Sequence, residues 1–319
     1  MQFKEYILVF ALSLGLTLVL YPVLIPFLHK LKYGQTVSEY MPSQAKKSGT
    51  PTMGGLVFIA TPILAQVILF PSSLKNPSLL LVILAFIGYG VIGFIDDYII
   101  VVTKNNAGLS PRNKFLLQLF LGIVFYMVFQ SHISTAVSIP FTSISIELGP
   151  LYVFLVLLLF ASCSNAVNLT DGMDGLAGGT SMLALTPFVF FAIREGNYEV
   201  ASFVVAIIAA LIGYLRYNFF PAKIFMGDCG SLALGGVLAA LGLVLKKELL
   251  IIVIGFVFVM ETASVILQIF WVKTFGHRII KCSPIHYHFE QSGMSEKQVV
   301  FMFYGMGAVC ALLGFFMGM

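Results

Sequence analysis

Ten long stretches of this 319-residue chain carry almost no charged side chains, and this pattern restricts the fold more than any other feature. A helix needs about 20 mostly apolar residues to cross a bilayer. Inside hydrocarbon, only helices and closed barrels satisfy their own backbone hydrogen bonds. We therefore predict an all-α, polytopic integral membrane protein with about ten transmembrane helices. The predicted spans are 6–28, 48–74, 76–95, 115–146, 148–170, 175–193, 200–215, 229–245, 249–272 and 298–319.

The ninth predicted span, 249–272, is the least regular because Glu261 interrupts it. An ionised carboxylate is costly in hydrocarbon, so we expect Glu261 to face protein or water, with a bend in the helix. The spans 200–215 and 229–245 are short, so we expect flanking residues to extend these helices across the membrane. No connection between spans is longer than 25 residues, so we predict one transmembrane domain over 1–319.

Basic residues are distributed unequally between the two ends of the predicted bundle. Alternation of ten spans places five connections on one face, and these hold 13 of the 18 Lys and Arg residues. Positively charged loops stay in the cytoplasm, so we predict that this face is cytoplasmic and that both termini are extracytoplasmic. The net charge of +4 suits anionic lipid and phosphate partners, and nothing in the sequence indicates nucleic acid. The five connections are 29–52, 96–114, 165–174, 216–228 and 273–297.

All five aspartates lie on this same face, at the ends of long apolar runs. In a chain with only 10% charged residues, ionisable groups beside hydrocarbon mark a functional site by default. Carboxylates gathered from three separate loops suggest a bound divalent cation and a phosphorylated substrate. Two of the five are adjacent, so on a continuing helix they point about 100° apart and cannot both face one ion. The five are Asp96, Asp97, Asp171, Asp174 and Asp228.

Two strings on these connections combine polar side chains with glycine. The string KKSGTPTMGG, 46–55, can bring backbone amides and a lysine to an anion, although a flexible basic linker explains it equally well. The string NLTDGMDGLAGG, 168–179, places two aspartates three residues apart, on one helical face. Helix capping explains only one of them, so this string favours a polar pocket for a base or a sugar.

Two later strings carry aromatic and imidazole groups. In NFFPAKIFMGDCGS, 218–231, phenylalanines precede Asp228, which suits a stacked nucleobase beside a metal ligand. A simple helix cap is the alternative for Asp228. In PIHYHFE, 284–290, two histidines at i and i+2 match no common zinc motif. They can hold a diphosphate, or they can be ordinary interfacial histidines.

Together with the aspartate pair, these strings occur in one order on five same-side loops. In this they resemble the phospho-N-acetylmuramoyl-pentapeptide transferase family of the polyprenyl-phosphate N-acetylhexosamine-1-phosphate transferase superfamily. The resemblance covers essentially the whole chain. It implies transfer of phospho-N-acetylmuramoyl-pentapeptide from its UDP-linked donor to undecaprenyl phosphate, giving lipid I and UMP. It also implies a place in the bacterial cytoplasmic membrane, a requirement for Mg²⁺, and the option of a homodimer.

Individual site residues follow from the resemblance position by position. Asp96, Asp97, Asp228 and His286 are the expected catalytic residues. Asp228 is an expected magnesium ligand, and we add Asp97 to the metal site. The resemblance implies a substrate pocket formed by Lys47, Thr52, Asn168, Asp171, Asp174, Asn218, Phe225 and Gln268, and we add Lys114 and His288 as expected substrate-binding residues.

The chain departs from the family pattern at two places. The family's run of three histidines has Tyr287 at its middle position, where we expect the ring to pack at the interface with its hydroxyl toward water. Many members also carry a basic residue soon after the aspartate pair. Here apolar residues follow, and the nearest candidates to contact the diphosphate are Lys104 and Lys114.

The reaction implied by the family joins two anions, so catalysis must neutralise charge and align the reacting atoms. Mg²⁺ needs only one or two protein carboxylates, so some of the aspartates must bind sugar or base. Asp96 is either a general base or a group that positions the lipid phosphate. Two alternatives stay open: a sister transferase that uses UDP-N-acetylglucosamine, and a cation- or proton-coupled transporter. The motif at 284–290 argues against the first. Acids at one interface, rather than near mid-bilayer, argue against the second.

Overall fold

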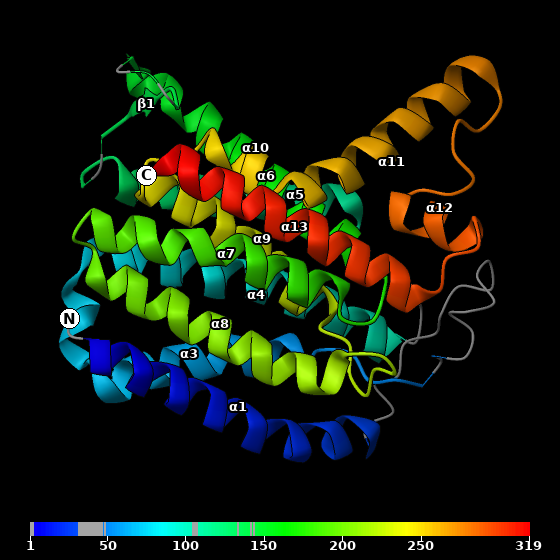
Figure 1. The fold of residues 1–319 in the computed structure, drawn as a ribbon, viewed down its shortest axis with the longest axis horizontal. Coiled ribbons are helices and arrows are strands. Elements are labelled where there is room, and N and C mark those ends of the chain that lie inside the picture. Colours follow the sequence, from blue (N-terminus) through cyan, green and yellow to red (C-terminus); the bar gives the residue numbers. More distant parts are fainter. Residues whose placement is uncertain are drawn as a thin grey trace.

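The apolar stretches of the sequence form helices that pack side by side in one bundle (Figure 1). The computed structural model describes residues 3–30, 47, 49–103, 108–132, 134–140, 142 and 144–319. Within these ranges nine helices are long and apolar enough to cross a membrane, which confirms the predicted all-α, polytopic class. They are α1 (Phe3–Lys30), α4 (Pro77–Thr103), α5 (Pro111–Phe129), α6 (Tyr152–Thr170), α7 (Leu176–Arg194), α8 (Tyr198–Asn218), α9 (Gly227–Val244), α11 (Phe256–Phe275) and α13 (Glu296–Gly318).

Two predicted spans are longer than the helices that they contain. In the second, only α3 (Gly55–Leu69) is α-helical, because Pro71 begins the short 3₁₀ helix η1 (Pro71–Lys75). In the fourth, α5 ends at Phe129 and a hairpin follows, formed by β1 (Ala136–Ser138) and β2 (Ser145–Glu147). That segment alternates β-branched with polar residues, a pattern that favours strands. The 3₁₀ helix η2 (Gly149–Leu151) leads into α6.

The ninth predicted span is broken, as expected, into α10 (Leu250–Ile254) and α11. The break falls at Gly255, the residue type with the lowest helix propensity after proline. Beyond it, α11 leans away from the other helices and ends beside the short α12 (Ile285–Gln291) (Figure 1). Glu261 is fully buried against protein, which confirms that it does not face lipid, but it lies six residues beyond the break and inside α11.

Helix α9 forms the centre of the bundle, and every residue from Cys229 to Val244 is buried. Glycines allow α9 to approach its neighbours closely. A Cβ on Gly93 of α4 would collide with the carbonyl of Asp228, and one on Gly55 of α3 would collide with Gly230. The close contact at Gly93 brings the end of α4, with its two aspartates, against the first turn of α9. Glycine packing in the core therefore assembles the acidic site.

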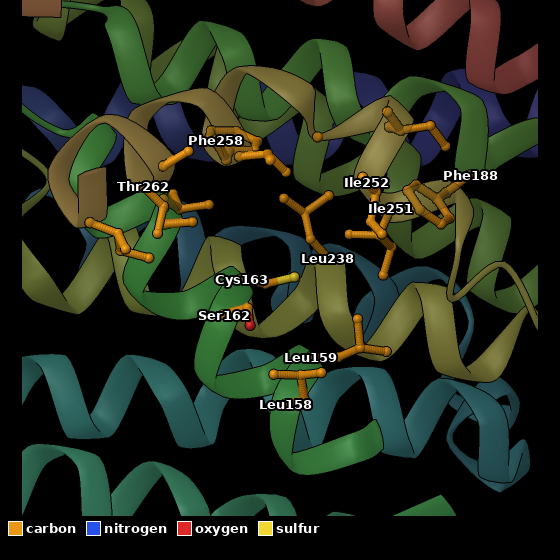
Figure 2. A pocket seen from close by; sticks show the side chains of 17 residues that line it. Leu158, Leu159, Ser162, Cys163, Phe188, Leu238, Ile251, Ile252, Phe258 and Thr262 are labelled. Carbon is orange, nitrogen blue, oxygen red and sulfur yellow. The ribbon is translucent and has the colours of Figure 1, made fainter. Parts of the chain in front are cut away.

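Both ends of the chain lie at one end of the bundle, and α12 lies at the opposite end (Figure 1). An apolar pocket of about 370 Å³ opens between α6, α9, α10 and α11 (Figure 2). Leu158, Leu238, Ile251 and Phe258 are among the residues that line it, and Thr262 is one of its few polar groups.

Candidate active site

Asp97 lies near the end of α4 and points at the first turn of α9. Its Oδ1 accepts the backbone N–H of Asp228 at 3.1 Å, and its Oδ2 accepts the backbone N–H of Cys229 at 3.0 Å. These amides have no partner within α9, and the helix dipole favours a negative charge at this end. Asp97 is only 5% exposed, so it serves as the buried anchor that fixes the position of Asp228.

Asp96 points in a different direction from its neighbour. Its Oδ1 accepts the backbone N–H of Leu109 at 2.8 Å, and its Oδ2 lies 3.5 Å from Nζ of Lys114. Because α4 continues to Thr103, the two adjacent carboxylates diverge, as the helical geometry requires. They therefore have different surroundings and can perform different tasks.

The ammonium group of Lys114 lies between two of the predicted catalytic aspartates. Ser110 caps α5 by accepting the N–H of Asn113, which places Lys114 in the first turn of that helix. Its Nζ forms an ion pair with Asp228 as well as the longer contact with Asp96. Of the two basic candidates that follow the aspartate pair, Lys114 reaches the cluster, whereas Lys104 lies outside the described residues.

Asn168, at the end of α6, completes the surroundings of Asp228. Its Nδ2 donates to Asp228 Oδ1 at 2.7 Å and to Ser231 Oγ at 2.9 Å. The side chain of Asp228 is 23% exposed, compared with 7% for Asp96, so it is the more accessible of the two. Sequence reasoning missed Ser231, although its spacing of three residues from Asp228 on one helical face was a usable signal.

A second polar cluster surrounds Asp174 in the loop between α6 and α7. Lys47 Nζ lies 2.6 Å from Asp174 Oδ1 and 2.5 Å from Oε1 of Glu296, in the first turn of α13. Glu296 also accepts the backbone N–H of Asp174 at 2.8 Å, and Asp174 Oδ2 accepts the N–H of Ala222 at 2.8 Å. Glu296 was not predicted, because at a helix start it reads as an ordinary first-turn acid.

Asn218 secures the same loop from α8. Its Oδ1 accepts the N–H of Gly175 at 2.9 Å, and its Nδ2 donates to the carbonyl of Ile224 at 2.9 Å. The hydroxyl of Tyr304 donates to the carbonyl of Gly175 at 2.7 Å. Asn218 therefore joins the predicted 168–179 and 218–231 strings through their backbones.

The first and fourth predicted strings also pair directly. Phe225 donates its N–H to the carbonyl of Pro51 at 2.9 Å and accepts the N–H of Gly54 at 2.8 Å. Thr52 lies between these contacts and is 3% exposed, and its hydroxyl has no hydrogen-bond partner among the described residues. A side chain at Gly227, where φ is +69°, would collide with both Thr52 and Asp97. Thr52 and Phe225 are thus placed beside the Asp97 anchor.

Asp171 follows α6 and is partly buried. Burial first, and then the negative charges of Asp228 and Asp174, raise its pKa to about 8, while Lys47 acts in the opposite direction. The carboxyl group is therefore mostly protonated at neutral pH and can donate a hydrogen bond.

The two predicted histidines occupy different environments on α12. His286 is fully buried, and its Nδ1 lies 3.0 Å from Oε2 of Glu261. His288 instead accepts the backbone N–H of Lys281 at its Nδ1, at 3.3 Å. The structure therefore does not bring both imidazoles to one point, because residues two apart on a helix face nearly opposite directions. Glu261 was expected to face protein or water, but its histidine partner was not predicted.

The expected position of the Tyr287 hydroxyl was wrong. The hydroxyl group donates to the carbonyl of Gly172 at 3.1 Å instead of facing water. The glycine carbonyl needs a donor when protein covers it, and the phenol supplies one.

Gln268 in α11 holds the loop that follows that helix. Its Oε1 accepts the N–H groups of Ile279 and Ile280, and its Nε2 donates to the carbonyl of Ile280 at 3.0 Å. All three of its contacts are made to loop backbone, so the structure gives it a supporting task at the edge of the site.

Within the described ranges, no three carboxylate, imidazole or thiol groups are gathered so that they could hold a metal ion. The arrangement nevertheless offers a cation, Lys114, between two carboxylates, and a half-open carboxylate on Asp228. Such a site can neutralise and align phosphate groups.

Family models match two parts of the chain. A model described as Glycosyl transferase family 4 matches residues 79–246, which is more than half of the chain and includes all five aspartates. A model described as Phospho-N-acetylmuramoyl-pentapeptide-transferase signature 1 matches residues 47–59, the segment that contains Lys47 and Thr52.

Curated relatives match over nearly the whole length. A phospho-N-acetylmuramoyl-pentapeptide-transferase of Halalkalibacterium halodurans is 46% identical over 317 residues, 98% of both chains. One of Staphylococcus carnosus is 47% identical over 309 residues, 95% of this chain and 96% of the relative. One of Bacillus subtilis is 44% identical over 317 residues, 98% of both. These relatives favour the muramoyl branch over the acetylglucosamine transferase and over a transporter. The chain therefore belongs to the phospho-N-acetylmuramoyl-pentapeptide-transferase family.

Proposed function

We propose that the protein transfers phospho-N-acetylmuramoyl-pentapeptide from its UDP-linked donor to undecaprenyl phosphate, releasing UMP and forming lipid I. The observation that carries this proposal is the near-full-length identity of 44–47% with relatives of that name. The cluster formed by Asp96, Lys114 and Asp228 supplies a site of suitable chemistry for it.

In this reaction an oxygen of the lipid phosphate attacks the β-phosphorus of the donor. The new bond joins that oxygen to the β-phosphorus, and the bond from the β-phosphorus to the oxygen bridging it to the α-phosphorus breaks, so that UMP leaves with the bonding electrons. Both reactants are anions, and Lys114 provides positive charge between them. A phosphate monoester with a second pKa of about 6 is already mostly dianionic at neutral pH. Asp96 therefore acts by positioning the nucleophile through Lys114, with general-base action as the alternative.

We further propose that the reaction depends on Mg²⁺. Asp228 would hold the ion, since its carboxylate is the more exposed of the two that flank Lys114 and already accommodates a cation. Mg²⁺ takes one or two protein carboxylates together with substrate phosphates, which fits the absence of a larger ligand cluster among the described residues. When bound, the ion supplies further neutralisation of diphosphate charge. Asp97, whose two oxygens hold α9 amides, supports this site by fixing Asp228.

The nucleotide part of the donor is assigned to the second cluster together with Thr52 and Phe225, which lie beside the Asp97 anchor. Lys47 offers a positive charge, and the protonated Asp171 offers a donor to a base or sugar. Thr52 contributes a buried hydroxyl whose partner is not among the described residues, and Phe225 contributes a partly buried ring that suits stacking.

The undecaprenyl chain needs an apolar surface beside the site. The pocket between α6, α9, α10 and α11 has this character over about 370 Å³ (Figure 2). We assign one part of the chain to it, since an apolar pocket can pack against hydrocarbon as closely as lipid does without exposing polar groups to it.

The orientation in the membrane belongs to the same proposal. The polar site lies at the end of the bundle opposite to both termini, and the basic loops favour that end as cytoplasmic (Figure 1). The protein then resides in the bacterial cytoplasmic membrane with both termini outside. Association into homodimers is a further proposal, which light scattering of the detergent-solubilised protein checks.

Release of UMP by the purified protein tests the function. UDP-N-acetylmuramoyl-pentapeptide and UDP-N-acetylglucosamine are supplied in parallel, each with undecaprenyl phosphate and Mg²⁺, and with EDTA in a matched sample. We expect UMP only from the first donor and only with the metal. UMP from the second donor alone would identify the sister transferase, and no UMP from either would remove the transferase assignment.

A further inference from the structure

Glu261 is a buried carboxylate that no step of the proposed transfer uses. It lies within α11, fully shielded from solvent, in a stretch of otherwise apolar sequence. A carboxylate at such a position is costly unless its charge and its hydrogen-bonding capacity are matched. A buried acid in a membrane-spanning helix therefore requires a specific partner.

The partner of Glu261 is His286, 25 residues later on α12. Nδ1 of the imidazole lies 3.0 Å from Oε2 of the carboxylate, and neither side chain is exposed. An ionised carboxylate can only accept hydrogen bonds, so Nδ1 must carry the proton. The contact fixes both the orientation of the ring and its tautomer, as a carboxylate does for the histidine of a catalytic triad.

The other ring nitrogen, Nε2, faces the loop 171–175. It has no hydrogen-bond partner among the described residues. A Cβ on Gly172 would collide with Nε2, so glycine is what allows the imidazole to approach the loop. On the same short helix, the Tyr287 hydroxyl donates to the carbonyl of Gly172. His286 is therefore directed at backbone that lies between Asp171 and Asp174.

We propose that Glu261 is a positioning residue for the transfer reaction, which holds His286 so that Nε2 is directed past Gly172 at a phosphate of the bound nucleotide sugar. This inference rests on the proposed function. A hydrogen bond from Nε2 to a phosphate oxygen requires a proton on each ring nitrogen, and Glu261 accepts the one on Nδ1. The carboxylate acts on the substrate only through the histidine.

A purely structural role for the pair would be to fasten α11 to α12. The two roles differ in what a nearly isosteric change does. Glu261→Gln keeps the size of the side chain and one acceptor, but it removes the charge that holds the proton on Nδ1. A fastening role predicts lower thermal stability with normal turnover, whereas a positioning role predicts lower turnover by folded protein.

Glu248→Gln is the matched control. Glu248 is also a buried glutamate, 2% exposed, and its Oε1 lies 2.5 Å from Nζ of Lys246 at the end of the bundle opposite to the site. For Glu261→Gln we expect kcat to fall by about tenfold to a hundredfold, the usual cost of losing a partner that orients a functional histidine, with KM changed by less than about threefold. For Glu248→Gln we expect wild-type kcat and KM.

A double-mutant cycle with His286→Ala tests whether Glu261 acts through the histidine. We expect Glu261→Gln to reduce kcat by less than about twofold in the His286→Ala background. Independent losses that multiply would overturn the proposal, as would a wild-type kcat in Glu261→Gln. The wild-type protein in the same assay distinguishes the positioning role of Glu261 from the proposed function. If the wild-type protein releases no UMP, the proposed function is wrong.

Nitrogen NMR of ¹⁵N-histidine-labelled protein tests whether Glu261 fixes the proton on Nδ1 of His286. The signals lost in His286→Ala identify the ring, and we expect a protonated Nδ1 in the wild type that is no longer fixed in Glu261→Gln. An unchanged tautomer would overturn the proposal. If Glu261→Gln does not fold, Glu261→Met takes its place in every measurement, with the same expected and contrary results.

Discussion

Asp97 accepts a hydrogen bond of 3.1 Å from the backbone N–H of Asp228, and through this contact the end of α4 fixes the start of α9. The two aspartates therefore differ in kind, although both are predicted catalytic residues. Asp97 is buried and satisfied by two amides, whereas Asp228 is the partly open group that meets Lys114. Substitution of each by asparagine should show which aspartate stabilises the fold and which one only takes part in the reaction.

For Asp97→Asn we expect loss of activity together with lower stability. The new amide group turns its NH₂ toward a backbone N–H, and a buried unsatisfied donor costs about 1–3 kcal/mol. For Asp228→Asn we expect loss of activity with nearly unchanged stability, because an amide is a poor magnesium ligand and a partly exposed ion pair contributes little. Thermal unfolding and UMP release are measured on both. Equal unfolding temperatures with activity retained in Asp97→Asn would contradict this division.

Lys114→Met should reduce turnover by at least about a hundredfold, the loss that follows from removing about 2.7 kcal/mol of transition-state stabilisation. The methionine keeps the length of the side chain but leaves Asp96 and Asp228 without the cation between them. Arg112→Met is the control, since Arg112 is exposed in the same turn of α5. Equal effects of the two changes would show that only the overall positive charge of the loop matters.

Asp171 should cause turnover to fall at alkaline pH, which forms the alkaline limb of the pH–rate profile. Its pKa of about 8 lies above the ordinary value, so the carboxyl is neutral below that pH and ionises as the pH rises through it. Ionisation removes a donor and adds a negative charge near the diphosphate, so we expect turnover to fall through that range. Asp171→Asn stays neutral and should lose this limb. An identical pH profile in Asp171→Asn would assign the limb to another group.

Tyr287→Phe should lower activity only about threefold to tenfold, because the change removes one hydrogen bond to the Gly172 carbonyl, worth about 0.5–1.5 kcal/mol. Tyr287→His should stay near wild type, since a ring N–H can replace the phenol as the donor. His286→Ala should lose tenfold or more. The three variants are compared at equal expression. A larger loss in Tyr287→Phe than in His286→Ala would make the phenol the principal group on α12.

Reporter fusions test the orientation of the bundle. Alkaline phosphatase at the C-terminus should be active and a fluorescent protein there should be dark, because 13 of the 18 basic residues lie on the opposite face. The reverse pattern would place the site outside the cytoplasm.

The helical part of the fold follows from the sequence because apolar length is a direct physical requirement for spanning a membrane. The charge-free stretches identify nearly every long helix, and Glu261 correctly marks the irregular one. The same criterion overestimates 115–146, because hydropathy counts residues of a hairpin and of a helix alike. The turn-forming and β-branched content of that segment was the additional signal.

The candidate site was predictable to the extent that its groups occur in unusual strings. The spacing around Asp171 and Asp228 marked both clusters. Glu296, Ser231 and the pairing of Glu261 with His286 were not visible, because each depends on which distant helices meet. The different roles of Asp96 and Asp97 could not be predicted either, because the sequence does not show which of the two side chains faces α9.

Glu296 belongs to the first turn of the last helix, yet it balances the charge of Lys47, which precedes the second predicted span. Chains are synthesised from the N-terminus, so the first cluster, built from α4 to α9, can assemble while the ribosome is still at work. The second cluster cannot form until α13 has been made, because Glu296 lies in the first turn of that helix. A chain cut before α13 would keep the contacts around Asp228 but would leave Lys47 with only one of its two carboxylate partners, Asp174.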